Sequence, residues 1–177
     1  MLNKIIQFEN FSLGNNLPFV LIAGPCQLES LTHSKKLADK LSEICLKLNI
    51  PFVFKGSFDK ANRTSKDSPR GIGIDKGLVI LDKIAREFNC PVLTDVHETT
   101  QCAAVGEVAD ILQIPAFLCR QTDLLVAAGK TMRAINVKKG QFLAPQDMRH
   151  VAEKISSTNN KKIMLCDRGT SFGYNTL

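Results

Sequence analysis

Tryptophan is absent from this sequence of 177 residues, tyrosine occurs once, and aromatic residues make up only 6% of the chain. Modules that bind single-stranded nucleic acid stack bases on aromatic side chains, so this scarcity argues against a nucleic-acid partner. The net charge of +6 does not alter that conclusion, because the lysines are scattered along the chain without a basic block. Small anionic substrates account for the charge equally well.

Long hydrophobic runs are also missing. No stretch approaches the roughly 20 apolar residues that a membrane-spanning helix needs. Residues 1–6 lack the hydrophobic core of a secretory signal peptide. We therefore expect no membrane partner and a cytoplasmic location.

Cysteine pairs with C-x-x-C spacing are a third absence, which argues against zinc ribbons and thioredoxin-type redox motifs. The six cysteines stand at positions 26, 45, 90, 102, 119 and 166. Without a secretory signal, disulfides are not expected. Cys45, Cys90, Cys102 and Cys166 are most simply core residues, whereas Cys26 follows a predicted strand among polar groups and needs a separate explanation.

The sequence alternates short apolar runs with longer segments in which apolar residues recur at helical spacing. Six runs predict parallel strands covered on both faces: residues 19–23, 52–55, 92–96, 111–114, 134–138 and 163–167. Five helices are expected between them, over residues 30–49, 78–88, 99–106, 122–132 and 145–155. In the first of these helices the apolar stripe consists of Leu37, Leu41, Ile44, Cys45 and Leu48. Residues 4–13 predict a small β-hairpin.

This alternation leaves two architectures, a doubly wound open sheet and a (β/α)8 barrel. A closed barrel takes eight strands and typically about 250 residues, whereas six strands are countable here. We expect one domain over residues 1–177, with residues 1–17 as a hairpin that caps one end.

Polar groups follow almost every predicted strand. The six strand ends carry, in chain order, Gly24-Pro-Cys26, then Lys55 with Ser57 and Lys60, then Asp95, Gln113, Lys138 and finally Asp167-Arg168-Gly169. The carboxyl ends of parallel strands lie at one edge of the sheet, where such folds bind their ligands. We therefore expect these side chains in one pocket.

Three lysines and an arginine in one pocket would repel each other unless an anion neutralises them. The ligand expected from this pattern is small and carries several negative charges, such as a phosphate and a carboxylate. Asn62, Asp95 and Gln113 add partners for hydroxyl groups, which suits a sugar. Cys26 faces the same pocket and is consistent with a nucleophile, a metal ligand or an inert small residue.

The residues at these strand ends also form longer motifs. They are Ala-Gly-Pro-Cys-Gln-Leu-Glu-Ser at 23–30, Lys-Gly-Ser-Phe-Asp-Lys-Ala-Asn-Arg at 55–63, Thr-Asp-Val-His-Glu at 94–98, the run 112–124, Asn-Val-Lys-Lys-Gly-Gln-Phe at 136–142, and Cys-Asp-Arg-Gly-Thr-Ser-Phe-Gly-Tyr-Asn at 166–175. In this order they closely resemble the 3-deoxy-D-manno-octulosonate 8-phosphate synthase family (2-dehydro-3-deoxyphosphooctonate aldolases). The resemblance covers essentially the whole chain.

The resemblance implies a (β/α)8 TIM barrel, of which about six β/α units are present here, and an assembly that is usually a homotetramer. It implies an aldol-type condensation of phosphoenolpyruvate with D-arabinose 5-phosphate, which releases phosphate and feeds lipopolysaccharide (Kdo) synthesis. By position, the phosphoenolpyruvate site comprises Lys55, Ser57, Lys60, Gln113, Lys138 and Arg168, with Lys60, Lys138 and Arg168 as the catalytic residues. Arabinose 5-phosphate is expected on Asn62, Arg63, Thr64 and Asp95, with Arg120 supplied by a neighbouring subunit.

Cys26 places the chain with the metal-dependent branch of that family, whose other branch has asparagine there. The resemblance therefore implies a divalent metal ion (Zn, Fe or Mn). In the family the remaining metal ligands lie on about two further β/α units, and none of those positions occurs in this sequence. The expectation is thus a truncated barrel with exposed edges, and the activity of these 177 residues alone is uncertain.

Two other functions stay open beside the synthase. One is a non-catalytic remnant that at most binds phosphate ligands. The other is the related synthase that makes 3-deoxy-D-arabino-heptulosonate 7-phosphate from erythrose 4-phosphate and usually has Lys-Pro-Arg-Thr where this chain has Lys60-Ala-Asn-Arg63. Asn62 offers one more hydroxyl partner, which favours the longer sugar.

Overall fold

The computed structural model describes residues 4–171 and residue 173, and the chain forms two compact units. The first holds the described residues up to Asp95 together with Val108–Asp110, and the second holds Val96–Glu107 and the described residues from Ile111 onward. Each unit has parallel strands that alternate with helices, the α/β arrangement of a partial TIM barrel. The expectation of one domain over residues 1–177 remains a prediction.

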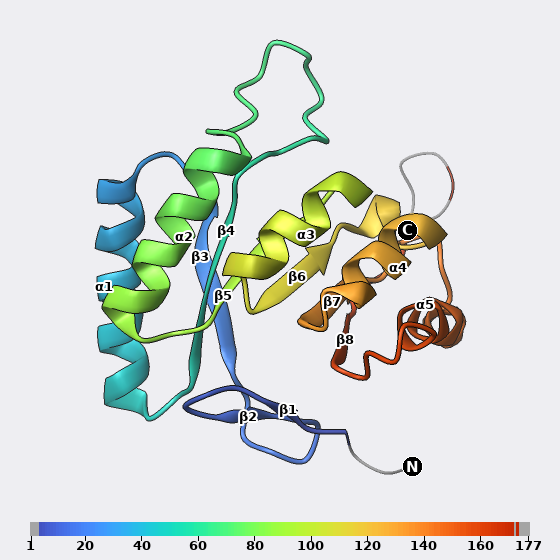
Figure 1. Ribbon diagram of the computed structural model, residues 1–177, viewed down its shortest axis with the longest axis horizontal. Helices are drawn as coiled ribbons and strands as arrows, with labels where there is room; N and C mark the ends of the chain where they lie inside the picture. Colours follow the sequence, from blue (N-terminus) through green and yellow to red (C-terminus); the bar gives the residue numbers. More distant parts are fainter. Residues whose placement is uncertain (1–3, 172, 174–177) are drawn as a thin grey trace. The chain divides into compact units, whose positions relative to one another are not determined.

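The first unit begins with an antiparallel hairpin of β1 (Ile6–Gln7) and β2 (Ser12–Leu13), as predicted. Three strands and two helices follow: β3 (Leu21–Gln27), α1 (Leu31–Leu48), β4 (Phe52–Ser57), α2 (Ile74–Phe88) and β5 (Val92–Asp95). β4 pairs in parallel with both β3 and β5. Helices α1 and α2 lie side by side and pack against these strands (Figure 1).

The ends of both helices in this unit follow from their sequences. Ser30 caps α1, because its hydroxyl accepts a hydrogen bond from the backbone N–H of His33 at 3.1 Å. Asn49 and Asn89 end α1 and α2 in the left-handed conformation, with φ of 53° and 46°. Asparagine tolerates this conformation better than most residues, so the two predicted helix ends are confirmed.

The buried face of α1 differs from the prediction. Ser34, Ala38 and Cys45 are buried, whereas Ile44 and Leu48 are 50% and 62% exposed. Small side chains allow the helix to approach its neighbours closely, so the buried face is centred on them rather than on the largest apolar residues. The predicted burial of Cys45 and Cys102 is confirmed, but Cys90 and Cys166 are only half-buried.

The second unit continues the same alternation. Its elements are α3 (Thr99–Val108), β6 (Ile111–Ile114), the short 3-10 helix η1 (Ala116–Leu118), α4 (Thr122–Lys130), β7 (Ala134–Lys138), the 3-10 helix η2 (Pro145–Asp147), α5 (Met148–Ser156) and β8 (Ile163–Cys166). β7 pairs in parallel with β6 and β8. The strands predicted at 111–114 and 134–138 agree with β6 and β7 at both ends.

Strand β3 is the largest departure from the predicted boundaries. It was expected at residues 19–23, yet it runs on through Gly24-Pro-Cys26 to Gln27, with a register shift between Ala23 and Cys26. A Cβ atom on Gly24 would lie 1.9 Å from the carbonyl oxygen of Lys55, so only glycine allows this approach. Cys26 has a φ of 55°, far from the values of a regular strand.

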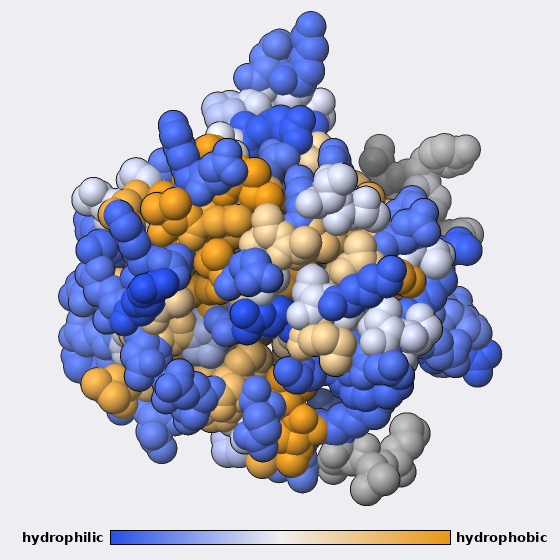
Figure 2. All heavy atoms as spheres, in the orientation of Figure 1, coloured by the Kyte–Doolittle hydropathy of each residue, from blue (hydrophilic) through white to orange (hydrophobic). Residues whose placement is uncertain are grey.

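Figure 2 shows one face of the molecule, coloured by hydropathy. Hydrophilic residues cover most of the face in Figure 2, including the loop that projects from the first unit after β4 (Figure 1). Among the described helices, none combines the length and apolar character needed to cross a membrane.

Candidate functional site

Five polar side chains gather in the first unit around the carboxyl ends of its strands. They are Cys26, Lys55, Ser57, Lys60 and Asp95, and we call them the Asp95 cluster. Lys55 and Ser57 are two residues apart on β4 and therefore point to the same face of the strand. Asp95 is the last residue of β5, and Lys60 lies in the loop that follows β4.

Asp95 is the centre of this cluster. Its Oδ2 atom accepts a hydrogen bond from the hydroxyl of Ser57 and lies 4.0 Å from Lys55 Nζ and 3.8 Å from Lys60 Nζ. Lys60 Nζ also donates to Ser57 Oγ at 3.0 Å. The two lysine side chains are 15% and 17% exposed and Asp95 is 8% exposed. With Cys26 as a thiol, the cluster has two ammonium groups and one carboxylate, an excess of positive charge that favours an anion.

The two lysines also act on Cys26. Burial by itself would raise the pKa of the Cys26 thiol, but a hydrogen bond from Lys60 and the positive charges of Lys60 and Lys55 lower it, while Asp95 raises it. The net direction is a lowered pKa. A larger fraction of Cys26 is therefore thiolate near neutral pH than for an ordinary cysteine, and the thiolate is the form that attacks electrophiles and binds metals.

Replacing Lys60 by methionine is expected to raise the pKa of Cys26 and to slow its alkylation by iodoacetamide near neutral pH. The pH at which alkylation becomes fast should shift upward, because the hydrogen bond and the charge of Lys60, the two largest causes that lower the thiol pKa, are removed while Lys55 remains. The rate at Cys26 is followed by peptide mass spectrometry across a pH series. Lys66→Met, which removes an exposed lysine of the same loop, is the control and should leave the profile in place; an unchanged profile in Lys60→Met would contradict the assignment.

The residues expected on the sugar phosphate lie in the loop after β4. Asn62, Arg63 and Thr64 are all exposed. Arg63 is tied back to the first unit, because its Nη2 donates to Gln27 Oε1 at 2.5 Å and its Nε to the carbonyl of Pro69 at 3.3 Å. The loop therefore holds one guanidinium next to the end of β3, while Asn62 and Thr64 remain open to solvent.

The other expected site residues belong to the second unit. Gln113 on β6 is buried, and its Oε1 accepts a hydrogen bond from Asn136 Nδ2 at 2.9 Å. Asn136 and Lys138 are two residues apart on β7, so Gln113, Asn136 and Lys138 share one face of the strands. Asn136 was not singled out from the sequence, although its even spacing from Lys138 would have placed it on that face.

Arg120 and Arg168 are both exposed. Arg120 follows η1, and its carbonyl oxygen accepts a hydrogen bond from Lys154 Nζ at 3.0 Å. Arg168 lies just beyond β8. Of the motif at 166–175, residues 172, 174 and 175 lie outside the described part of the chain.

A metal site is not complete within the described residues. No three side chains of histidine, cysteine, aspartate or glutamate come close enough together there to hold an ion. Cys26 is thus a candidate ligand without a described ligand set around it.

Comparison with known proteins finds one family model and relatives that share one name. A family model described as the DAHP synthetase I family matches residues 3–177. Proteins named 2-dehydro-3-deoxyphosphooctonate aldolase are 57% identical in Rickettsia bellii (strain OSU 85-389), 61% in Granulibacter bethesdensis and 58% in Bartonella quintana. These matches cover 98–99% of this chain and 62–64% of the relatives. The chain thus spans somewhat less than two thirds of the length of the proteins it resembles.

Proposed function

The chain belongs to the DAHP synthetase I family, and on that premise we propose that it serves the condensation of phosphoenolpyruvate with D-arabinose 5-phosphate. The products are 3-deoxy-D-manno-octulosonate 8-phosphate and inorganic phosphate, and the reaction belongs to lipopolysaccharide (Kdo) synthesis. The names of the relatives support the octulosonate product over the heptulosonate made from erythrose 4-phosphate. The observation that carries the proposal is the Asp95 cluster, with its excess of positive charge at the strand ends.

In this proposal the Asp95 cluster binds the anionic groups of phosphoenolpyruvate. Lys55 and Lys60 supply charge, and Ser57, which donates its hydroxyl to Asp95 and accepts from Lys60, holds the Lys60 ammonium at the site. Ammonium groups that are already held in place stabilise charge that develops on the phosphate and carboxylate without a reorganisation step. Lys60 is the catalytic residue proposed within this set, and its ammonium is held by the bond to Ser57 and by Asp95.

Three residues of the second unit are proposed as phosphoenolpyruvate-binding residues by their positions in the sequence motifs. Gln113, Lys138 and Arg168 are proposed there, with Lys138 and Arg168 as catalytic residues. The hydrogen bond from Asn136 Nδ2 to Gln113 Oε1 holds the Gln113 amide on the face of the strands that it shares with Lys138.

Arabinose 5-phosphate is proposed on Asn62, Arg63, Thr64 and Asp95. The guanidinium of Arg63 suits the sugar phosphate, since its planar set of donors matches a phosphate group. In the reaction C3 of phosphoenolpyruvate forms a bond to the aldehyde carbon of the sugar, water adds at C2, and the C–O bond to phosphate breaks. Arg120 is proposed to reach the sugar phosphate of a neighbouring copy, which would make the protein a homo-oligomer.

Cys26 is proposed as a ligand of a divalent metal ion, supported by the lowered pKa of its thiol. The described residues do not by themselves fit such an ion, so no step above is assigned to it. A cytoplasmic location is proposed as well, supported by the six cysteines, which are all free thiols and suit a reducing compartment.

The test is the release of inorganic phosphate from phosphoenolpyruvate by the purified chain. Release is expected only when arabinose 5-phosphate is present, because the sugar aldehyde is the acceptor of the new carbon–carbon bond. Parallel reactions contain erythrose 4-phosphate or no sugar, and equal release with erythrose 4-phosphate would overturn the substrate assignment. Binding of phosphoenolpyruvate without release under any condition would favour the non-catalytic alternative.

A further inference from the structure

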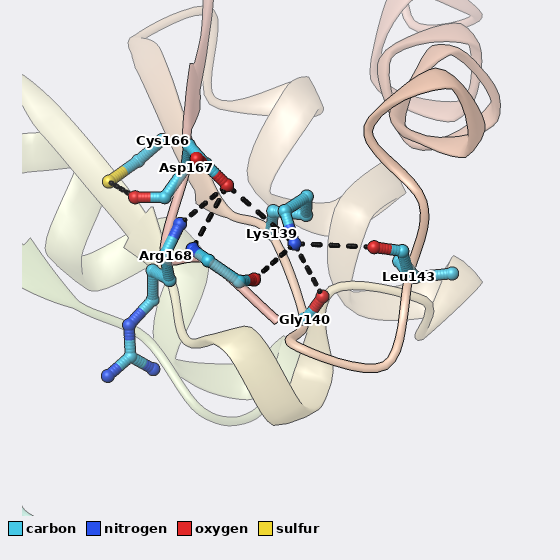
Figure 3. A network of polar contacts seen from close by, with 7 residues as sticks. Lys139, Gly140, Leu143, Cys166, Asp167 and Arg168 are labelled. Carbon is cyan, nitrogen blue, oxygen red and sulfur yellow. Dashed lines mark hydrogen bonds and ion pairs between the residues drawn. The ribbon is translucent and has the colours of Figure 1, made fainter. Parts of the chain in front are cut away.

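Lys139 is a buried ammonium group that the proposed reaction does not use. It follows β7 directly and is only 3% exposed. Its Nζ donates hydrogen bonds to three carbonyl oxygens, those of Gly140 at 3.2 Å, Leu143 at 3.3 Å and Gly169 at 2.6 Å. It also lies 3.7 Å from Oδ1 of Asp167 (Figure 3).

These contacts define what Lys139 can do. A buried charge is tolerated only when it is hydrogen-bonded and paired, and an ammonium group has three donors, all of which the three carbonyls accept. Lys139 is therefore committed to the protein backbone and has no donor left for a ligand. Its neighbour Lys138 points to the opposite face of β7 and is only half-buried, so the two adjacent lysines have different roles.

The carbonyls that Lys139 binds belong to two separate segments, the loop 140–143 and the turn 167–169. Backbone bonds join the same segments, from Lys139 N to Cys166 O at 2.8 Å and from Ser171 N to Gln141 O at 3.2 Å. The ammonium of Lys139 thus fastens the turn beyond β8 to the loop beyond β7.

Arg168 is the central residue of the turn that Lys139 fastens. On one side Oδ1 of Asp167 accepts the backbone N–H groups of Arg168 at 2.9 Å and Gly169 at 3.1 Å. On the other side the carbonyl of Gly169 is bound to Lys139. The guanidinium of Arg168 points away from Lys139 (Figure 3). The ammonium of Lys139 therefore contacts both neighbours of Arg168, namely the Asp167 carboxylate and the Gly169 carbonyl. The Arg168 side chain itself makes no contact with Lys139 in Figure 3.

We propose that Lys139 is a positioning residue that fixes the 167–169 turn and thereby sets the place of the Arg168 guanidinium. This inference rests on the proposed function, which puts Arg168 on phosphoenolpyruvate. Lys139 does not touch the substrate; it acts through Arg168.

The first test measures amide hydrogen exchange in the full chain. In Lys139→Met the amides of Arg168, Gly169 and Ser171 are expected to exchange about fivefold faster, the factor that one lost hydrogen bond gives. Lys138→Met is the matched control, since it removes the adjacent charge but none of the bonds in Figure 3, and it should leave these amides unchanged. Unchanged exchange in Lys139→Met, or equally fast exchange in both variants, would overturn the proposal.

The second test asks whether Lys139 acts through Arg168. Phosphoenolpyruvate affinity is measured for the wild type, Lys139→Met, Arg168→Ala and the double variant. Lys139→Met is expected to weaken binding about three- to tenfold in the wild type but hardly at all when Arg168 is already alanine, because coupled residues are not additive. An equal loss in both backgrounds would show that Lys139 acts on binding by another route and would overturn the proposal.

The two tests separate this inference from the proposed function. Absence of phosphoenolpyruvate binding in the wild type would overturn the proposed function, while the exchange comparison would still decide whether Lys139 fixes the turn. If Lys139→Met does not fold, Lys139→Gln replaces it, because a shorter, neutral amide keeps two donors for the buried carbonyls but removes the ammonium. Faster exchange of Arg168 and Gly169 in that variant, with weaker phosphoenolpyruvate binding, supports the proposal, and normal exchange with normal binding contradicts it.

Discussion

Replacing Asp95 by alanine is expected to lower the free energy of unfolding by about 3 kcal/mol, the loss typical of breaking a buried ion pair. Asp95 accepts the hydroxyl of Ser57 and is the carboxylate nearest to Lys55 and Lys60 in the cluster. Its removal leaves two ammonium groups close together with little solvent around them. Urea denaturation of the wild type and the variant measures the difference.

Asp82→Ala is the control for the loss of a carboxylate. Asp82 pairs with Arg86 on the surface of α2 at 2.9 Å, with side chains 42% and 80% exposed, and such pairs contribute less than about 1 kcal/mol. Added inorganic phosphate should restore part of the stability of Asp95→Ala, since an anion can take the place of the missing carboxylate. A loss below about 1 kcal/mol in Asp95→Ala would mean that Asp95 does not hold the cluster together.

Lys60→Met is expected to weaken the binding of phosphoenolpyruvate roughly 10- to 100-fold, the range for one lost hydrogen bond to a charged group. Lys60 donates to Ser57 and lies near both Asp95 and Cys26, so its ammonium is held in place before a ligand arrives. Titration calorimetry with phosphoenolpyruvate measures the affinity of each protein.

Lys66→Met carries the same change of net charge in the same loop and is the comparison for Lys60→Met. Long-range attraction between the protein and an anion is screened by salt within about 10 Å, so Lys66→Met should cost at most about threefold in affinity, and less at higher salt. Similar losses in the two variants would mean that general charge, rather than a site at Lys60, attracts the ligand.

Much of the fold was predictable because its signal is local. Short apolar runs and apolar stripes predicted the strands and helices in the right order, and the stripes also predicted where the first two helices end. The position of the buried face of α1 could not be predicted from its stripe. An apolar stripe indicates that one side of a helix is apolar, but the neighbouring elements decide which residues of that side are buried. In α1 they bury Ala38 and leave Ile44 half exposed.

The sequence indicated which residues belong to the candidate site, but it did not indicate which contacts they make with one another. The strand ends predicted one pocket for all their polar side chains, and of these the structure brings Lys55, Ser57 and Asp95 together within the first unit. The sequence did not show that Asp95 bonds to Ser57, because a contact between neighbouring strands depends on register and side-chain reach. The sequence also did not show which of the two adjacent lysines, Lys138 or Lys139, is buried. The alternation of side chains along β7 indicates only that they point to opposite faces.

The left-handed backbone at Cys26 has an evolutionary consequence. With a φ of 55°, position 26 favours residues that enter this conformation at small cost, and asparagine is prominent among them. Asparagine is also the residue that the resemblance implies for the metal-independent branch. Exchange of cysteine and asparagine at this position therefore requires no new backbone path for β3. One substitution at position 26 would therefore exchange the proposed thiol ligand for an amide without a change in the path of the strand.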